Sequence, residues 1–226
     1  MTKLRRESLL HMREKHKITD CLKSNLRWII VAIFTIILIT IIINILNNQI
    51  QSFDMKVYSV ISKFISQTNT TIMKIITNLA SATILCGICA AILIFIKNKK
   101  YGLLISISLF ISTILNIILK NIFSRPRPEG YRLIEVEGLS FPSGHSMASM
   151  TFYGFLIYLI LKKVQNKYIK WILIIILSIL ILMVGTSRIY LGVHYASDVI
   201  GGFCFSIIYL AFYTYFIENL ITSKVE

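Results

Sequence analysis

The chain has 226 residues, is 56% hydrophobic and carries a formal net charge of +14 at pH 7. Its apolar residues form long uncharged runs of about 20 residues, which excludes an ordinary soluble domain and predicts a polytopic membrane protein. The basic residues lie in short segments beside these runs, where they orient membrane spans and attract anionic lipid headgroups, so we expect the bilayer and no nucleic acid as a partner.

The chain starts with a basic segment, residues 1–27, followed by the first apolar run at 28–46. This run is longer than the core of a secretory signal, and the NNQIQSF sequence after it has no small-x-small cleavage site. We therefore expect 28–46 to be a retained membrane helix and 1–27 to be a cytoplasmic tail.

Residues 53–66 have apolar side chains at helical spacing and predict a short helix. These side chains are Phe53, Val57, Val60, Ile61 and Phe64. An amphipathic helix lying on the membrane interface and a connecting helix packed on the bundle are equally compatible with this pattern.

Five more apolar runs follow, and they are too long for the strands of a membrane barrel and lack period-two alternation. They lie at 72–96, 103–119, 146–161, 171–186 and 198–217. The predicted fold is an all-α, polytopic membrane bundle of six transmembrane helices, forming one domain over 28–217 before a short cytoplasmic tail at 218–226.

We interpret Cys86 and Cys89, a C-x-x-C inside the second run, as small, buried and inert.

The distribution of charge predicts the orientation. Eight Lys and Arg residues precede the first run, three lie in the 97–102 loop and four in the 162–170 loop, which is fifteen of the 24 in the chain. With six spans these segments share one side, and the positive-inside bias places that side in the cytoplasm. The segments 47–71, 120–145 and 187–197 then face outward.

Two of the outward segments combine histidines with basic residues, and an aspartate follows the second of them. Asp198 follows His194 by four residues, and on a helix these positions share a face. A carboxylate there can fix the imidazole tautomer and stabilise the positive charge that develops when the other nitrogen attacks. His145 is then available as a general acid for a leaving oxygen.

Three cations, Lys120, Arg127 and Arg188, lie near the same membrane edge. Guanidinium groups match phosphate oxygens, and Lys acts as a point charge. We expect Ser143 to cap the helix that follows it, and Gly144 to let the backbone approach an anion at that helix N-terminus. Together these residues predict a site for a polyanionic, tetrahedral group.

The spacing of these residues resembles the type 2 phosphatidic acid phosphatase superfamily, whose motifs are K-x6-R-P, P-S-G-H and S-R-x5-H-x3-D. The chain has Lys120 to Arg127-Pro128, then Pro142-Ser143-Gly144-His145, then Ser187-Arg188 to His194 and Asp198, all without a substitution. The resemblance covers residues 70–217 and implies a metal-independent lipid phosphate phosphatase that needs no cofactor.

The resemblance also implies roles. His194 would form a phosphohistidine, Asp198 would orient it and His145 would protonate the leaving alcohol. The phosphoryl oxygens would be bound by Lys120, Arg127, Ser143, Gly144 and Arg188. The expected substrate is undecaprenyl pyrophosphate, with phosphatidylglycerol phosphate and phosphatidic acid as alternatives. A non-catalytic lipid-binding or transport protein is the alternative from another class, and the pattern does not determine the oligomeric state.

Overall fold

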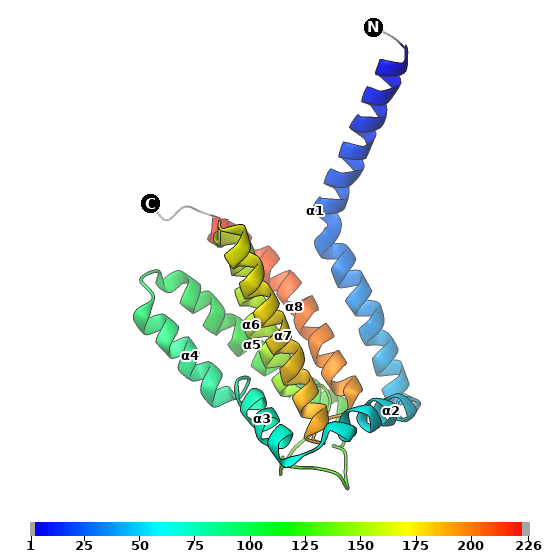
Figure 1. Ribbon diagram of the computed structural model, residues 1–226, viewed down its shortest axis with the longest axis vertical. Helices are drawn as coiled ribbons and strands as arrows, with labels where there is room; N and C mark the ends of the chain where they lie inside the picture. The colour runs from blue at the N-terminus through cyan, green and yellow to red at the C-terminus, as the bar shows by residue number, and fades with distance from the viewer. Residues whose placement is uncertain (1–2, 223–226) are drawn as a thin grey trace.

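The computed structural model describes residues 3–222 of the chain, and the side chains of residues 25–218. This described part is helical and contains no strand (Figure 1). Its elements are α1 (Lys3–Leu46), α2 (Gln51–Ile61), a 3₁₀ turn (Ser62–Phe64), α3 (Gln67–Asn78), α4 (Ala82–Phe95), α5 (Lys99–Phe123), α6 (Gly144–Lys163), α7 (Lys167–Tyr190) and α8 (Ala196–Thr222).

Five of these helices contain stretches long and apolar enough to cross a membrane. They are Asn25–Leu46 of α1, then α5, α6, α7 and Ala196–Glu218 of α8. Large apolar side chains on their outer faces are exposed, among them Ile36 (65%) and Phe110 (66%), as expected where a helix meets lipid. The predicted all-α membrane bundle is confirmed, and the number of spans reaches six if α3 and α4 count as one.

The single helix expected over 72–96 is instead broken in two. α3 and α4 meet at a bend of 46° around Leu79–Ser81. The side chain of Ser81 caps α4 by accepting from the N–H of Ile84, and the hydroxyl of Tyr153 donates to the carbonyl of Leu79 at 2.7 Å. These partners satisfy the backbone groups that the break frees, so an apolar run can be interrupted there.

The helix predicted within 53–66 is present, and it packs on the bundle. Val57 and Ile61 of α2 contact a cluster of buried residues on α7 and α8, while Phe53, Val60 and Phe64 are exposed. The segment is thus a connecting helix packed on the bundle, and its position at the membrane interface stays a prediction. Figure 1 shows α2 lying across one end of the bundle.

The helix α6 occupies the centre, in contact with α5, α7 and α8, and its Phe152 and Phe155 are buried in the main core. The helix α1 packs against α8 (Figure 1). Because α6 is held on three sides, its N-terminus is fixed at the end of the bundle where the 124–143 loop, the end of α7 and the start of α8 also lie.

Candidate active site

The PSGH turn forms the N-terminus of α6. Ser143 is the N-cap, and its Oγ accepts from the N–H of Ser146 at 3.4 Å and from the Ser146 hydroxyl at 2.9 Å. The predicted cap is confirmed. Asn116 of α5 supports the turn by donating to the carbonyl of Pro142 at 3.1 Å. The turn is therefore held from within and from a neighbouring helix.

The N-terminal part of α8 lies directly against this turn. The N–H of Ser143 donates to the backbone carbonyl of Asp198 at 3.1 Å, which joins the second motif to the third. A Cβ at Gly201 would lie 2.5 Å from the Phe141 ring, and one at Gly202 would lie 3.0 Å from the carbonyl oxygen of Ser143. The two adjacent glycines thus permit a contact that larger residues would prevent.

His194 and Asp198 are in contact, although they do not share a helix as expected. His194 lies in the turn before α8, and Asp198 lies in the first turn of that helix. The Oδ2 of Asp198 accepts from the N–H of Tyr195 at 2.8 Å and lies 3.4 Å from Nδ1 of His194. This is the geometry of a carboxylate that reaches back to cap its own helix, and it brings the carboxylate to the imidazole.

Asp198 is completely buried, with two further partners. The Nη1 of Arg125 donates to its Oδ1 at 2.6 Å, and the hydroxyl of Ser140 donates to its Oδ2 at 2.5 Å. Because a buried carboxylate needs this many donors to stay charged, Asp198 is built as a fixed anion beside His194.

Arg127 approaches His194 from the opposite side. Its Nη1 lies 3.0 Å from Nε2 of His194 and also donates to the carbonyl of Val193, while its Nε donates to the carbonyl of Gly138. A guanidinium only donates, so Nε2 accepts and the neutral ring carries its proton on Nδ1, facing Asp198. The free electron pair of the imidazole therefore points toward a cation.

Burial lowers the pKa of His194 to about 4, helped by the positive charges of Arg127 and Arg188 and opposed by Asp198. The residue is 3% exposed. His194 is thus uncharged at neutral pH, which is the form able to attack an electrophile.

The remaining cations are held by backbone and side-chain acceptors. The Nζ of Lys120 donates to the carbonyl of Leu139, and Nη1 of Arg188 donates to the hydroxyl of Thr77 at 2.8 Å. The Nε of Arg188 is buried and makes no hydrogen bond within the described part of the chain. A buried donor of this kind is rare in proteins and suits an anionic ligand.

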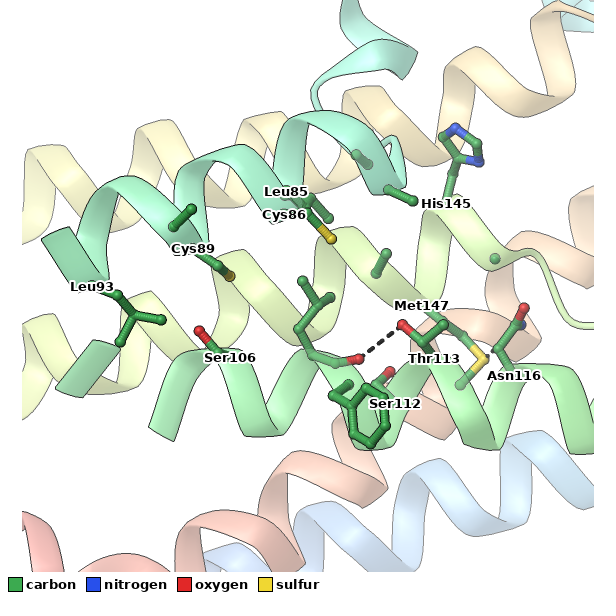
Figure 2. Close-up of a pocket in the computed structure, with 17 residues that line it drawn as sticks. Leu85, Cys86, Cys89, Leu93, Ser106, Ser112, Thr113, Asn116, His145 and Met147 are labelled. Atoms are coloured by element: carbon green, nitrogen blue, oxygen red, sulfur yellow. Dashed lines mark hydrogen bonds between the residues drawn. The ribbon is translucent and has the colours of Figure 1, made fainter. Parts of the chain in front are cut away.

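An apolar groove of about 640 Å³ runs along α4, α5 and α6 and ends at the PSGH turn. His145 and Asn116 lie at that end, and Leu93 and Ser106 lie at the other (Figure 2). Gly144, which precedes His145 in the turn, also lines the groove. Among the described side chains, the imidazoles of His145 and His194 share no hydrogen bond. His145 instead lies where the groove meets the N-terminus of α6.

The cysteines and acidic residues give further detail. Cys89 is buried, but Cys86 is exposed and lines the groove, so the expectation that both are buried is wrong for Cys86. Cys21 lies outside the described side chains. Within residues 25–218, no three His, Cys, Asp or Glu side chains gather as a metal site. Metal independence stays a prediction.

Three residues that contact the predicted set, and a fourth that contacts one of those three, were not predicted as site residues from the sequence. Arg125 and Ser140 contact Asp198, Thr77 contacts Arg188, and Asp54 of α2 contacts Arg125 at 2.8 Å. Only Arg125 had a signal, since it stands two positions before Arg127. No local sequence pattern predicts that the segments containing the other three residues pack against the site.

The sequence profile of the PAP2 superfamily, the type 2 phosphatidic acid phosphatases, matches residues 101–222, more than half of the chain. The chain belongs to the PAP2 superfamily. Its membrane-spanning helices and its relatives make this PAP2 protein a multi-pass membrane lipid phosphatase, a hydrolase that acts on phosphate esters.

Two relatives are named for different lipids. Phosphatidylglycerophosphatase B of Bacillus subtilis (strain 168) is 34% identical over 58% of this chain and 67% of its own length. Undecaprenyl-diphosphatase of Sulfolobus acidocaldarius is 29% identical over 77% of this PAP2 chain and 83% of its own.

Solved structures agree on the fold. The crystal structure of a transmembrane PAP2 type phosphatidylglycerolphosphate phosphatase from Bacillus subtilis aligns with a TM-score of 0.76 and 26% identity, covering 87% of this chain and 98% of that one. Aquifex aeolicus LpxE aligns with a TM-score of 0.58 and 22% identity over 71% of this chain and 94% of its own, which supports the PAP2 fold alone.

Proposed function

We propose that this PAP2 phosphatase hydrolyses a lipid phosphate through a phosphohistidine on His194. Asp198 orients and stabilises the imidazole, and His145 acts as the proton donor. The phosphoryl oxygens bind to Lys120, Arg127, Ser143, Gly144 and Arg188. The observation that carries the proposal is the position of Nε2 of His194, with a buried carboxylate on the far side of the ring and a guanidinium 3.0 Å from the attacking nitrogen.

In the first step, Nε2 attacks phosphorus, an N–P bond forms and the bond from phosphorus to the lipid oxygen breaks. His145 gives a proton to the leaving oxygen, so the lipid product departs as an alcohol or, from a diphosphate, as a monophosphate. In the second step, water attacks the phosphohistidine, His145 takes a proton from that water and phosphate leaves. The imidazole of His194 is cationic while it carries the phosphoryl group, and Asp198 balances that charge.

Two features support phosphate as the group bound at this position. The cations of Arg127 and Arg188 come from different elements and act on the same imidazole, so the site has a positive field of its own. The unpaired Nε of Arg188 and the N-terminus of α6 add donors aimed at an oxyanion.

The groove supports a lipid as the rest of the substrate. It is lined by apolar side chains of α4, α5 and α6 and begins at His145, so a chain lying in it would place its phosphate at the catalytic end (Figure 2). Its volume of about 640 Å³ is in the usual range for a ligand site.

Phosphatidylglycerol phosphate is the substrate we favour, because the Bacillus subtilis relative and a solved structure at 26% identity are both named for it. Undecaprenyl diphosphate, expected from the sequence, is the second candidate, since the archaeal relative is named for that activity. The basic segments further support an orientation with both termini in the cytoplasm and the site on the outer face.

The test is phosphate release by the purified protein in detergent with a strong chelator present. Phosphatidylglycerol phosphate, undecaprenyl diphosphate and phosphatidic acid are compared at equal mole fraction, with His194→Ala as the blank. We expect the first to give the highest kcat/KM and the blank to give no release. Equal turnover by the blank would contradict the mechanism, and loss of activity to chelator that returns with metal would contradict metal independence.

A further inference from the structure

Asp54 is the one buried residue of α2, and it is 2% exposed. It belongs to none of the three motifs, yet the partners of its carboxylate lie beside the candidate active site. Its Oδ2 accepts from Nη2 of Arg125 and from the hydroxyl of Ser197, each at 2.8 Å. Its Oδ1 accepts from the N–H of Ser197, also at 2.8 Å. A charged residue has been buried where α2 meets the start of α8.

Arg125 connects this carboxylate to the one beside His194. Its Nη2 binds Asp54, while its Nη1 donates to Oδ1 of Asp198 at 2.6 Å and to the hydroxyl of Ser197 at 2.8 Å. The guanidinium also lies 4.2 Å from the ring centroid of Tyr195, which fixes its plane. One guanidinium therefore bridges two buried carboxylates.

We propose that Asp54 is a positioning residue for the phosphatase reaction, which holds Arg125 so that it binds one oxygen of Asp198 and leaves the other aimed at His194. This inference rests on the proposed function, because it assumes that His194 is the nucleophile. Asp54 itself does not reach the substrate and acts through Arg125 and Ser197.

The hydrogen-bond geometry of Arg125 explains why Asp54 is needed. A guanidinium left alone with a carboxylate tends to bind it through two parallel hydrogen bonds. If both nitrogens of Arg125 turned to Asp198, Oδ2 would be drawn from Nδ1 of His194 and from the N–H of Tyr195. Asp54 occupies Nη2, so only Nη1 is offered to Asp198, and the contact at 3.4 Å to His194 is kept.

Charge balance gives a second reason. The charged groups that act on His194 are Asp198, Arg127 and Arg188, and Arg125 adds its charge behind Asp198. Asp54 offsets Arg125. Without it, the site would gain a positive charge just as the imidazole becomes cationic, so the phosphoryl-transfer step would slow while lipid binding in the groove would not change.

The decisive variant is Asp54→Asn, which keeps an acceptor for the N–H of Ser197 and removes the charge. We expect kcat to fall about 10- to 100-fold, as happens when outer partners of metal-binding side chains are lost. KM should change less than about twofold, and the acid limb of the kcat/KM profile should move to lower pH. The matched control is Val57→Ala on the same helix, which loosens the packing of α2 without touching the charges.

A purely structural role for Asp54 predicts that both variants lower thermal stability and leave kcat and the pH profile of the folded fraction unchanged. That result would overturn the proposal. A double-mutant cycle that combines Asp54→Asn with Arg125→Gln tests the proposal further. Two residues that act through one contact should give losses of kcat that are not additive. If Asp54→Asn does not fold, Ser197→Ala is tested in its place. We expect Ser197→Ala to lower kcat by a smaller factor and to leave KM unchanged. An unchanged kcat in Ser197→Ala would likewise overturn the proposal.

Phosphoenzyme trapping separates this proposal from the one it rests on. Rapid quenching in alkaline denaturant, in which the N–P bond survives, should recover phosphohistidine from wild-type protein, a slower accumulation from Asp54→Asn and none from His194→Ala. Phosphohistidine in wild type with an unaltered rate in Asp54→Asn would reject only the role of Asp54. Full activity of His194→Ala would reject the nucleophile, whatever Asp54→Asn does.

Discussion

Among the described side chains, two groups of three charges lie at opposite ends of the bundle, and they differ in burial. At the active-site end, Arg125 bridges Asp54 and Asp198, and the three side chains are 10%, 1% and 0% exposed. At the other end, Glu218 bridges Arg27 and Lys162, and these side chains are 32%, 25% and 40% exposed. The distances are alike, between 2.6 and 2.8 Å in all four pairs.

Ion pairs with equal N–O distances can therefore contribute very different free energies to stability. Breaking a buried pair leaves a charge without water or partner, which costs about 3–5 kcal/mol. An exposed pair is screened by solvent and contributes about 0.2–1 kcal/mol. The first group should be sensitive to any single change in charge, whereas the second should tolerate one.

The largest effect should come from Asp198→Asn. The amide keeps the shape but offers an N–H where a carboxylate oxygen faces Nδ1 of His194, so the wrong tautomer is favoured. In serine proteases with a Ser-His-Asp triad, the corresponding change of the aspartate lowers kcat about 10⁴-fold. We expect a loss of about 10²–10⁴-fold in kcat, measured by phosphate release. A loss below tenfold, with the protein folded, would contradict the role of Asp198.

The acidity of His194 gives the next prediction. Its pKa of about 4 lies below the ordinary histidine value of about 6.5, so the enzyme-derived acid limb of kcat/KM should lie near pH 4. The unfolded chain binds more protons between those values, so stability from this residue is lost as pH falls from about 6.5 to 4. The profile is measured with the ionisation of the substrate phosphate determined separately. An acid limb near pH 6.5 would mean that His194 is not desolvated as described.

The groove predicts a smaller effect that depends on the substrate. Ala90 lines the groove, and its neighbour Ala91 is exposed on α4 outside the groove lining. Ala90→Trp should raise KM for a long-chain lipid phosphate about tenfold and leave a short water-soluble phosphate ester unaffected. Ala91→Trp is the control for the added indole. Equal changes in both variants would show that the groove does not hold the lipid chain.

Some features of this fold can be predicted from local sequence, and others cannot. The spans and the cap at Ser143 follow from apolar length and from local hydrogen-bonding chemistry. The bend at Leu79–Ser81 could not be predicted in this way, because the carbonyl of Leu79 accepts its hydrogen bond from Tyr153, which is far away in the sequence. Asp54 is a lone carboxylate in an amphipathic segment, and nothing local distinguishes it from a solvated charge. Its burial arises only when α2 packs against α7 and α8.

The smallest effect should follow Glu218→Gln at the other end of the bundle. This change removes one negative charge, as Asp54→Asn does at the active-site end, and the three ion pairs that the two carboxylates make have matching distances of 2.7 to 2.8 Å. Because Arg27 and Lys162 remain partly exposed, water can solvate them, and we expect a stability loss of about 1 kcal/mol or less with kcat unchanged. Thermal unfolding and turnover are measured on both variants in the same detergent. If Glu218→Gln lowered kcat as much as Asp54→Asn, burial would not be what distinguishes the two groups, and a charge anywhere on the bundle would act on His194.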